Sequence, residues 1–516
     1  MRLRLSIGVA VAAVTITLAT GVTAQENYTQ WSKYKVLTLT PQSTLSATVD
    51  SFPMLVRLNA SNFTAQFDQD SSGVGGASIR FTDSTGTVRL PHQTERWNAA
   101  QQKAEIWVRV PRVLAGTAST RLRMYWGKAD AADSSMGSQV FKSGNGFAGV
   151  WNMGDASGTT ARPNQVAGGP VATLKNFTAT YYPSGYTAPE GIIGLADTLT
   201  GGSCDSVLIY AGKPYIDLNA NRTSYAPYNS LTSSGGTGFT WEGWYSDSTA
   251  TQSGARYFVA APDSFVSVAV TNNPGPTQVD GRIIIFRAGQ TFTTRWNTNA
   301  SPISTDPLGA GLLARQWQHL VATKDPGNVG VRFYINGVYR GIGTALTGSN
   351  DATRLYVQVG RSNCGNGSTV DTYLSGKVDA LRLSTVVRDS NWVKLSFGTQ
   401  CQAGVTNCPG TAPLTVGATV SMLPTALGAA SSSTPDFTVK AQGAGAIFRI
   451  AESSPAAVKV MDVRGRVVWS GSFAPGAREL SWNGAGVSSG LYVARLTVVG
   501  EKGVSSSVDR RLTLTR

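Results

Sequence analysis

Short runs with apolar side chains at every second position dominate residues 31–126. In "EIWVRV", Ile106, Val108 and Val110 face one way, and Trp107 and Arg109 face the other. This period of two is typical of a half-buried β-strand. The same pattern, broken by Gly-, Ser- and Asp-rich turns, predicts strands at Phe52–Leu58, Ala77–Asp83, Ala104–Pro111 and Thr120–Gly127. Short strands without long helices between them favour an antiparallel sandwich.

The stretch from Trp317 to Gly341 continues this pattern in the middle of the chain. In "WQHLVATKD", His319 and Val321 share one face, and Leu320 lies on the other. The turn "DPGN" that follows has Pro before Gly, and a later Asn-Gly pair supports positive φ in a second turn. We therefore expect His319 to be a hydrogen-bonded histidine packed inside a sandwich. The alternatives are a general base or a metal ligand.

Few residues in the sequence offer catalytic chemistry. The two histidines, His92 and His319, lie in different regions, and a Ser-His-Asp triad would need one of them. A retaining glycosidase needs two carboxylates about 5–5.5 Å apart. Glu242 and Asp379 each stand without a second acid on their own strand face, with Lys377 and Leu381 beside Asp379. We predict no catalytic and no cofactor-binding residue, although an atypical site assembled from separate loops stays an alternative.

Composition supports a β-rich protein that acts outside the cytoplasm. A chain of 516 residues is too long for a single hydrophobic core, so we expect several domains. Only 14% of the residues are charged, and 41% are hydrophobic, which is enough for folded domains. The net charge is +14, but the longest basic clusters are pairs such as Arg510-Arg511. Nucleic-acid binders concentrate their charge on one element, so we predict no nucleic-acid partner. A diffusely basic surface would attract anionic glycans only weakly, and salt would screen that attraction.

The first 24 residues have the pattern of a signal peptide. Arg2 and Arg4 precede an apolar run, and Val22-Thr23-Ala24 offers small residues at the cleavage position. We expect residues 1–24 to be removed, leaving an exported protein, extracellular or on the outer cell surface, with no integral membrane segment. An uncleaved anchor is the alternative, but the run is short and diluted by threonine.

Four cysteines in an exported chain indicate disulfides. Cys401 and Cys408 close a short loop and are expected to pair, which leaves Cys204 to pair with Cys364. A zinc site is the alternative, but it would need CxxC-like spacing and nearby histidine.

Residues 25–146 form the first expected domain, an N-terminal β-sandwich. The series "WSKYKVLTL", "FPMLVRL", "SIRFTD", "LPHQTERWN", "AEIWVRVP", "LRMYWG" and "VFKSGNGFAGVWNM" spans residues 31–153. It resembles a bacterial domain of unknown function that often precedes lectin-like sandwiches. That family also occurs fused to proton channels of the MotA/TolQ/ExbB type, but the present sequence has no channel segment. The resemblance implies a fold and no chemistry.

Residues 147–400 form the second expected domain. "GVWNMGDASGTTARPN", "FTWEGWYS", the stretch at Trp317 and "LSGKVDALRLSTVVRDSNW" resemble a LamG-like jelly roll of the concanavalin A-like lectin/glucanase superfamily. Two departures stand out, since Gln318 replaces the first histidine of the usual Trp-His-His and Ala380 replaces the glutamate of the usual Asp-Glu. The resemblance implies an optional calcium ion at the rim, for which Asp155, Asp325 and Asn336 are candidates. We expect these three side chains to serve turns instead, so metal ligands stay unknown and a structural calcium stays open.

The remaining residues are expected to form a linker and a third domain. Residues 401–440 are small, polar and dotted with proline, which suits an extended linker. In residues 441–516, "DVRGRVVWSG" and "SSGLYVARL" resemble an Ig-like C-terminal sorting domain of type IX secretion cargo. That resemblance implies the secretion machinery as a partner. The fold class is therefore all-β, with tandem antiparallel β-sandwiches: the N-terminal sandwich, the jelly roll and the small Ig-like domain.

These observations favour a non-catalytic binding protein of the cell surface or secretome. Its expected partner is a glycan or another extracellular polymer, held by the jelly roll. Tryptophan rings could stack on sugars, but core packing is the expected role of Trp126, Trp151, Trp241, Trp244, Trp296 and Trp392. The alternatives are a structural or adhesive protein that binds a protein partner, and an atypical polysaccharide-degrading enzyme.

Overall fold

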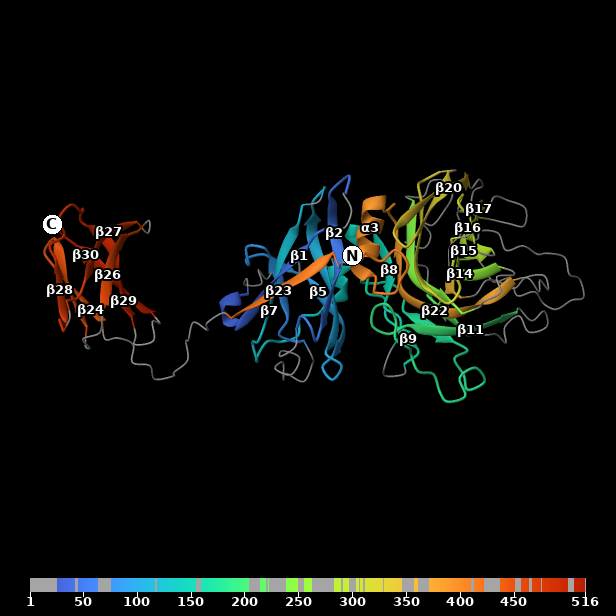
Figure 1. Cartoon of the computed structure of the whole chain (residues 1–516), viewed down its shortest axis with the longest axis horizontal. Helices are drawn as coiled ribbons and strands as arrows, with labels where there is room; N and C mark the ends of the chain where they lie inside the picture. Colours follow the sequence, from blue (N-terminus) through green and yellow to red (C-terminus); the bar gives the residue numbers. More distant parts are fainter. Residues whose placement is uncertain are drawn as a thin grey trace, which may run out of the picture. The chain divides into compact units, whose positions relative to one another are not determined.

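The computed structural model divides the chain into two compact units, residues 1–424 and 425–516. It describes residues 26–41, 45–63, 76–116, 118–154, 159–203, 214–219, 221, 238–248, 255–261, 283–288, 291–296, 303–305, 307–309, 311–327, 329–345, 357–360, 371–409, 413–421, 437–450, 456–463, 466–474, 476–499 and 505–515. Figure 1 shows that these residues are overwhelmingly strands, so the predicted all-β class is confirmed.

The N-terminal part of the first unit is a sandwich of two antiparallel sheets. One sheet has the order β23 (Leu414–Ser421), β1 (Lys33–Leu39), β7 (Thr120–Trp126), β3 (Arg80–Asp83) and β4 (Arg89–Leu90). The other has the order β2 (Val49–Asn59), β6 (Lys103–Val113) and β5 (His92–Asn98). The four strands predicted from alternation fall within or overlap β2, β3, β6 and β7. Apolar side chains of both sheets, among them Phe52, Phe81, Ile106 and Met124, form the core between them.

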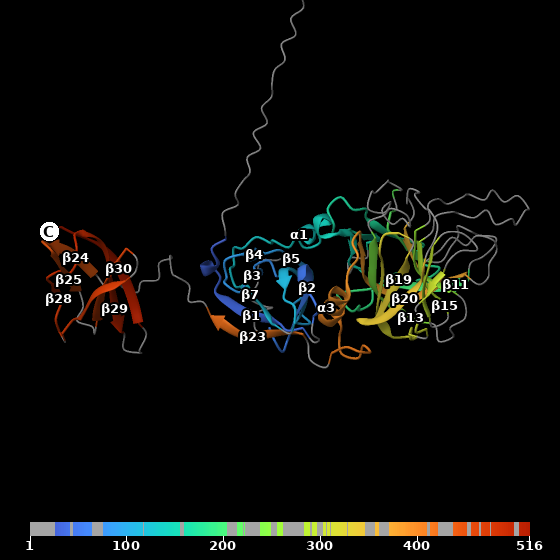
Figure 2. The same ribbon diagram turned by 90° about the horizontal axis from the view of Figure 1, so that it is seen from above.

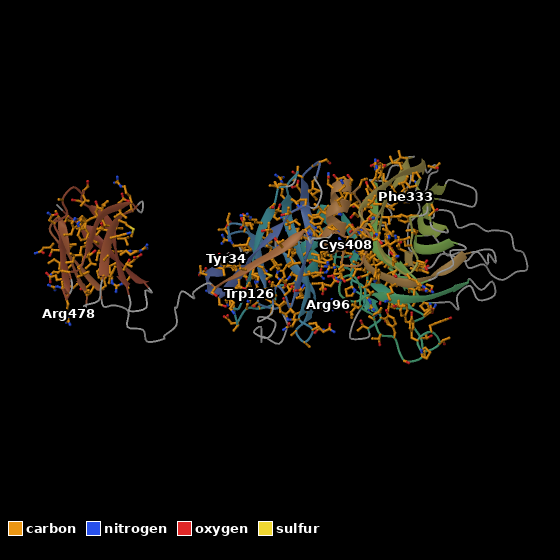
Figure 3. All side chains as sticks on the ribbon, in the orientation of Figure 1. Tyr34, Arg96, Trp126, Phe333, Cys408 and Arg478 are labelled. Atoms are coloured by element: carbon orange, nitrogen blue, oxygen red, sulfur yellow. A yellow bond between two sulfur atoms is a disulfide. The ribbon has the colours of Figure 1, made fainter. Side chains whose placement is uncertain are left out.

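The jelly roll follows as one network of fifteen described strands. Its main path is β20 (Val338–Ala345), β19 (Gly330–Ile335), β18 (Trp317–Lys324), β13 (Phe239–Asp247), β22 (Asp371–Ser384), β14 (Ala255–Ala261), β21 (Gln358–Val359), β12 (Tyr215–Asp217), β10 (Ala172–Lys175) and β9 (Ala161–Arg162). The branches are β8 (Phe147–Trp151), β11 (Asp197–Ser203), β15 (Ile283–Ala288), β16 (Thr291–Trp296) and β17 (Ile303–Thr305). Trp151, Trp241, Leu320, Phe333 and Leu381 pack in its core, and Phe333 is labelled in Figure 3.

Helix α3 (Ser390–Gln400) lies between the N-terminal sandwich and the jelly roll (Figures 1 and 2). Asp389 starts the helix by accepting a hydrogen bond from the Trp392 backbone N–H at 2.8 Å. On the sandwich side, the Trp392 ring meets Phe52 edge-on, with centroids 5.2 Å apart. On the jelly-roll side, the Phe397 ring lies 5.8 Å from that of Trp244. The helix therefore presents apolar side chains to both neighbours and joins them through one core.

The segment after the jelly roll corrects the predicted linker over residues 401–440. Leu414–Ser421 forms β23, which pairs antiparallel with β1 from Lys33↔Ser421 to Leu39↔Leu414. The jelly roll is thus inserted into the N-terminal sandwich, between β7 and β23. The sequence "LTVGATVS" alternates enough to form an edge strand, and its small polar residues suit an edge because many of its side chains are exposed.

The second unit is a small antiparallel sandwich. One sheet has the order β24 (Phe437–Gln442), β25 (Gly445–Ile450) and β28 (Glu479–Trp482), and the other has β27 (Val467–Ser472), β26 (Ala456–Asp462), β29 (Gly490–Val499) and β30 (Ser505–Leu514). Phe448, Val458 and Leu496 belong to the core between the sheets. The predicted boundary at residue 441 falls inside β24, so this sandwich includes residues from Phe437 onward.

Candidate functional site

His319 is a buried histidine with a carboxylate partner from the next strand. Its Nε2 lies 3.1 Å from Oε1 of Glu242, and both side chains are almost fully buried. The pairing of β13 with β18 places Trp244 opposite His319, and Glu242 lies two residues along the same face. The Asn336 side chain accepts a hydrogen bond from the His319 backbone N–H at 2.8 Å. The prediction of a packed, hydrogen-bonded histidine is confirmed, while the sequence analysis missed its partner Glu242.

Oε1 of Glu242 is the centre of a larger buried network. Arg382 Nη1 lies 3.3 Å from this oxygen, Gln400 Nε2 donates to it at 3.4 Å, and the Ser396 hydroxyl donates as well. Burial alone would raise the pKa of Glu242, but Arg382 and His319 outweigh it and hold the pKa far below its usual range. Glu242 is therefore a permanent anion locked under α3, where no substrate reaches it.

The network continues from the jelly roll into the N-terminal sandwich. The Arg382 guanidinium lies over the Trp107 ring, 4.3 Å from its centroid, and Trp107 Nε1 donates to Glu95 Oε2 at 2.5 Å. Burial and the neighbouring Asp379 raise the pKa of Glu95 to about 8. Trp107 is the residue that the alternation placed opposite the sandwich core, and it is buried because the jelly roll covers that face.

Asp379 occupies a β-bulge that the sequence analysis did not anticipate. Glu242 of β13 pairs with Arg382 of β22, and Trp244 pairs with Asp379. Two residue steps along β13 therefore match three along β22, so β22 has one extra residue, and Ala380 there takes a φ of 47°. The bulge shifts the alternation, so Leu381 enters the jelly-roll core while Asp379 faces the sandwich. The prediction that Asp379 and Leu381 share a face is therefore wrong.

A glycine turn covers Asp379 and touches Glu95. The Ile193 backbone N–H donates to Asp379 Oδ2 at 2.8 Å, and a Cβ on Gly191 would lie only 2.4 Å from that oxygen. A Cβ on Gly194 would lie 3.1 Å from Glu95 Oε1. Burial raises the pKa of Asp379 to about 7, and its side chain has no exposure. Two carboxyls thus meet at the junction, but only Glu95 reaches a cleft, so they do not form an accessible catalytic pair.

The cleft that Glu95 reaches lies between the two edge strands β5 and β9. It has a volume of about 630 Å³ and is lined by Gln93, Thr94, Glu95, Arg96, Trp97, Asn98, Gln101, Asn152, Met153, Gly154, Ala161, Arg162, Pro163, Gln165, Glu190, Gly194 and Leu195. We call it the junction cleft. Arg96, labelled in Figure 3, forms two hydrogen bonds with Glu105 and one of 2.8 Å with Glu190. Arg162 makes a bidentate pair with buried Asp197, at 2.8 and 2.7 Å.

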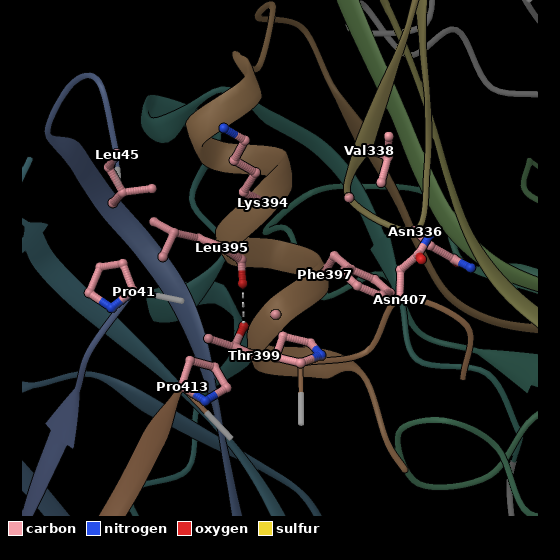
Figure 4. A pocket seen from close by; sticks show the side chains of 13 residues that line it. Pro41, Leu45, Asn336, Val338, Lys394, Leu395, Phe397, Thr399, Asn407 and Pro413 are labelled. Atoms are coloured by element: carbon pink, nitrogen blue, oxygen red, sulfur yellow. Dashed lines mark hydrogen bonds between the residues drawn. The ribbon is translucent and has the colours of Figure 1, made fainter. Parts of the chain in front are cut away.

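A second cavity, of about 240 Å³, lies beside α3 and is drawn in Figure 4. Leu395 and Pro41 line one side, and Asn336 and Val338 line the other. The Thr399 hydroxyl donates to the Leu395 carbonyl at 2.8 Å within the helix. Lys394 is the one charged side chain in the lining, so this cavity holds no acid for catalysis.

Comparison with known families agrees with this architecture. Residues 219–394 match the family model of the Concanavalin A-like lectin/glucanases superfamily. Residues 75–154 match that of a domain of unknown function (DUF2341). The two resemblances found in the sequence are confirmed for these residues, and we call the second region the lectin-like domain. No curated protein matches the chain.

Solved structures with similarity to the chain include carbohydrate-active proteins. Domain 4 of an extracellular arabinanase from Geobacillus stearothermophilus is 15% identical, covers 50% of this chain and 98% of its own, and gives a TM-score of 0.32. A Trypanosoma rangeli sialidase is 13% identical and gives a TM-score of 0.31. The match covers 60% of this chain and 42% of the sialidase, so the chain spans less than half of that enzyme. A CBM40 domain of a Ruminococcus gnavus sialidase is 10% identical and gives a TM-score of 0.29, and the match covers 39% of this chain and 96% of that domain. Scores this low carry no argument about ligand.

The remaining predicted site residues have mixed outcomes. Cys401 and Cys408 form the expected disulfide, with Cα atoms 5.8 Å apart, whereas Cys204 and Cys364 lie outside the described residues. Asp155 also lies outside them, and Asp325 forms an ion pair with Arg332. Within the described part of the chain, no group of three or more His, Cys, Asp or Glu side chains is arranged to hold a metal.

The candidate tryptophans are core residues wherever their side chains are described. Trp126, Trp151, Trp241, Trp244 and Trp392 are all at most 3% exposed, as expected, and the Trp296 side chain lies outside the described ones. The half-buried Trp97, which the sequence analysis did not single out, is the tryptophan that lines the junction cleft. No described helix combines the length and apolar character needed to cross a membrane.

Proposed function

We propose that this chain is a non-catalytic carbohydrate-binding protein. The observation that carries the proposal is the lectin/glucanase match of residues 219–394, combined with the burial of Glu242 and Asp379. Glu242 and Asp379 are buried beneath α3 and the Gly191–Gly194 turn, at 3% and 0% exposure, so neither of these two acids is accessible to solvent. Hydrolysis of a glycosidic bond would require two carboxyls on either side of a bound sugar.

The test is binding of the full chain to an array of polysaccharides, with release of reducing sugar measured in parallel. We expect retention on at least one polysaccharide and no release of reducing ends. Sugar release that disappears in a Glu95→Gln variant would replace the proposal with an atypical glycosidase. A folded chain that binds no polysaccharide would refute it.

A protein partner is the second candidate function, and the edge strand β20 favours it. Val338, Tyr339 and Ile342 are 46%, 47% and 51% exposed there, and Val338 also lines the cavity of Figure 4. Exposed apolar side chains that cluster on an edge strand are suited to contacts with another protein. Cross-linking on intact cells, with serine replacing these three residues in a control, separates this candidate from the first.

Export and surface attachment also belong to the proposal. The signal-peptide pattern of residues 1–24 and the resemblance of residues 441–516 to an Ig-like sorting domain support it. Removal of residues 425–516 is expected to leave the protein in the periplasm. Unchanged delivery to the surface would show that the second unit does not direct export.

A further inference from the structure

The junction cleft has the dimensions and shape of a ligand site that neither module makes alone. Its volume of about 630 Å³ falls within the range of about 300–1,000 Å³ that is usual for small-molecule sites. Gln93, Glu95 and Trp97 come from β5 of the N-terminal sandwich, while Asn152 and Gln165 come from the jelly-roll side. Both β5 and β9 are the last strands of their sheets, so the cleft lies between two sheet edges.

Half of the polar side chains that line the cleft are amides. Five of the lining residues are Gln93, Asn98, Gln101, Asn152 and Gln165. Each amide offers both donors and an acceptor, which matches a hydroxyl group that also donates and accepts. Gln93 is 8% exposed, and its Oε1 has no hydrogen-bond partner, although its Nε2 donates to Gln165 at 2.8 Å. Oε1 of Glu95, another lining residue, also has no hydrogen-bond partner.

The charged side chains of the cleft are already paired with one another or with nearby groups. Arg96 pairs with Glu105 and Glu190, and Lys103 lies 3.3 Å from Glu190. Arg162 pairs with Asp197. An anionic ligand would have to displace a carboxylate from each arginine, whereas a neutral ligand leaves these pairs intact. The raised pKa of Glu95, about 8, keeps this carboxyl largely uncharged near neutral pH.

An aromatic ring completes the set of groups. Trp97 is half-buried and lines the cleft, and its ring contacts Phe63, edge-on at 6.0 Å, and Gly76, where a Cβ would lie 2.7 Å from the ring. A ring fixed in this way offers apolar contact area at low entropic cost. Amides combined with an aromatic surface and paired charges are suited to a ligand that has many hydroxyls and apolar C–H faces.

We propose that the junction cleft binds a neutral, hydroxyl-rich saccharide, so that the N-terminal sandwich supplies half of the binding site. This inference rests on the proposed function, since it assigns the carbohydrate to a site. It also gives the module of unknown function a role, which is recognition by β5 and by the Asn98–Gln101 turn.

The test compares neutral and anionic polymers, using the full chain in affinity electrophoresis and calorimetry. The neutral probes are dextran, arabinoxylan, galactomannan and mixed-linkage β-glucan, and the anionic probes are dextran sulfate and polygalacturonate. We expect at least one neutral polymer to bind with a Kd that changes less than about twofold between 0.05 and 0.5 M NaCl, because no charge of the cleft is engaged. Binding of anionic polymers to the basic surface is expected to vanish in the higher salt.

The variant that locates the site is Gln101→Ala combined with Asn152→Ala. Both side chains lie outside the cores, so the fold is expected to persist, while the Kd for the neutral polymer rises about tenfold, which corresponds to about 1.4 kcal/mol. Asn152→Asp, which keeps the shape and removes the donors, is a second variant with the same expected direction. Gln30→Ala, at an exposed amide in η1 (Tyr28–Gln30), is the matched control.

Each result has a separate meaning. Neutral binding that survives in both cleft variants overturns the site and leaves the proposed function standing. Binding of anionic polymers alone, lost in salt, overturns the neutral saccharide. Retention of no polymer by the folded chain overturns the site and the proposed function together.

Discussion

Glu242 holds four side chains at one carboxylate oxygen, and this arrangement decides the chemistry of the face of β13 that meets α3. His319, Arg382, Ser396 and Gln400 all contact Oε1. Buried ions that satisfy one another fix a packing arrangement more than they add stability, but removing one partner leaves the others uncompensated. The network therefore fixes how α3 sits on the lectin-like domain.

Replacing Glu242 with glutamine is expected to lower the free energy of unfolding by about 3 kcal/mol, because Arg382 then stays buried without its counter-ion. Urea denaturation measures this change. Glu479→Gln, which breaks an exposed pair with Arg449, is expected to leave the midpoint unchanged. An equally small effect at Glu242 would mean that the network contributes nothing to the junction.

The carboxyls of Asp379 and Glu95 predict a dependence of stability on pH. Their pKa values in the folded protein, about 7 and about 8, lie above the ordinary 3.8 and 4.5. The folded state therefore binds more protons, and its stability falls as pH rises from about 4 to about 8, by up to about 1.4 kcal/mol per pH unit for each group. Below pH 4 this contribution is fully present.

Asp379→Asn tests this dependence through thermal melts between pH 5 and 8. The variant is expected to lose less stability over this range than the parent chain, because one titration is gone and Glu95 loses a like-charged neighbour. Asp509→Asn, at an exposed carboxylate whose pKa is lowered by Arg495, is expected to follow the parent. Identical slopes for all three proteins would contradict the assignment.

At this scale the sequence was sufficient to predict that His319 is buried, but not which residue is its partner. The alternation in "WQHLVATKD" predicted a packed His319, whereas Glu242 comes from another strand, and its position depends on a register that one strand cannot reveal. The sequence analysis assigned Asp379 to the wrong strand face because a β-bulge inserts one residue there. No glycine stands in β22 at the bulge to signal it in the sequence.

Helix α3 is the element that joins the two modules, and its ends are held from the sandwich side. At its start, Asn391 Oδ1 accepts from the Ser46 backbone N–H at 3.0 Å. At its end, the Arg57 guanidinium of β2 donates to the carbonyls of Thr399, Gln400 and Cys401, and also to that of Ile192 at 2.7 Å. A cation at a helix C-terminus satisfies the last carbonyls and opposes the helix dipole.

Arg57→Met is expected to lower the free energy of unfolding by about 2 kcal/mol, because four buried or half-buried carbonyls lose a charged donor. Arg112→Met is the control, since that arginine is exposed on the neighbouring strand β6 and pairs only with Asp50 among the described residues. Its unfolding midpoint is expected to match that of the parent. Equal behaviour of the two variants in urea would show that Arg57 does not cap the helix.

Strands were predicted well as elements, and their environment was predicted less well. The runs within β2, β6 and β7 alternate because one face meets the sandwich core. Trp107 lies on the opposite face of β6, where alternation alone predicts exposure, and it is buried because a second module covers it. A single sequence does not show which modules will share a core.

The whole first unit behaves as one folded body in which the lectin-like domain interrupts the sandwich. Sequence composition suggested a linker after residue 400, since "LTVGATVS" is short and polar, and nothing local indicates that its partner is β1 at the start of the chain. This insertion means that residues 147–400 in isolation would expose Arg382 and Trp392, which contact Trp107 and Phe52 of the sandwich.

Truncation separates the two possible boundaries. A chain that ends at residue 424 keeps β23 and is expected to melt at the same temperature as the first unit of the full protein. A chain that ends at residue 412 lacks β23, so the edge of β1 is open, and it is expected to melt several degrees lower and to self-associate. Calorimetry and light scattering measure both effects, and equal melting of the two chains would contradict a structural role for β23.

The pairing of Leu39 with Leu414 also affects the order in which the first unit folds. Strand β1 is synthesised before the lectin-like domain, and β23 follows only after that entire domain has been synthesised. Contacts between such distant segments form late, because the intervening chain must first be ordered. Until β23 docks, one edge of β1 has no hydrogen-bonded partner strand. A chaperone that shields exposed strands would therefore act mainly during this interval. Docking of β23 would then complete the folded unit.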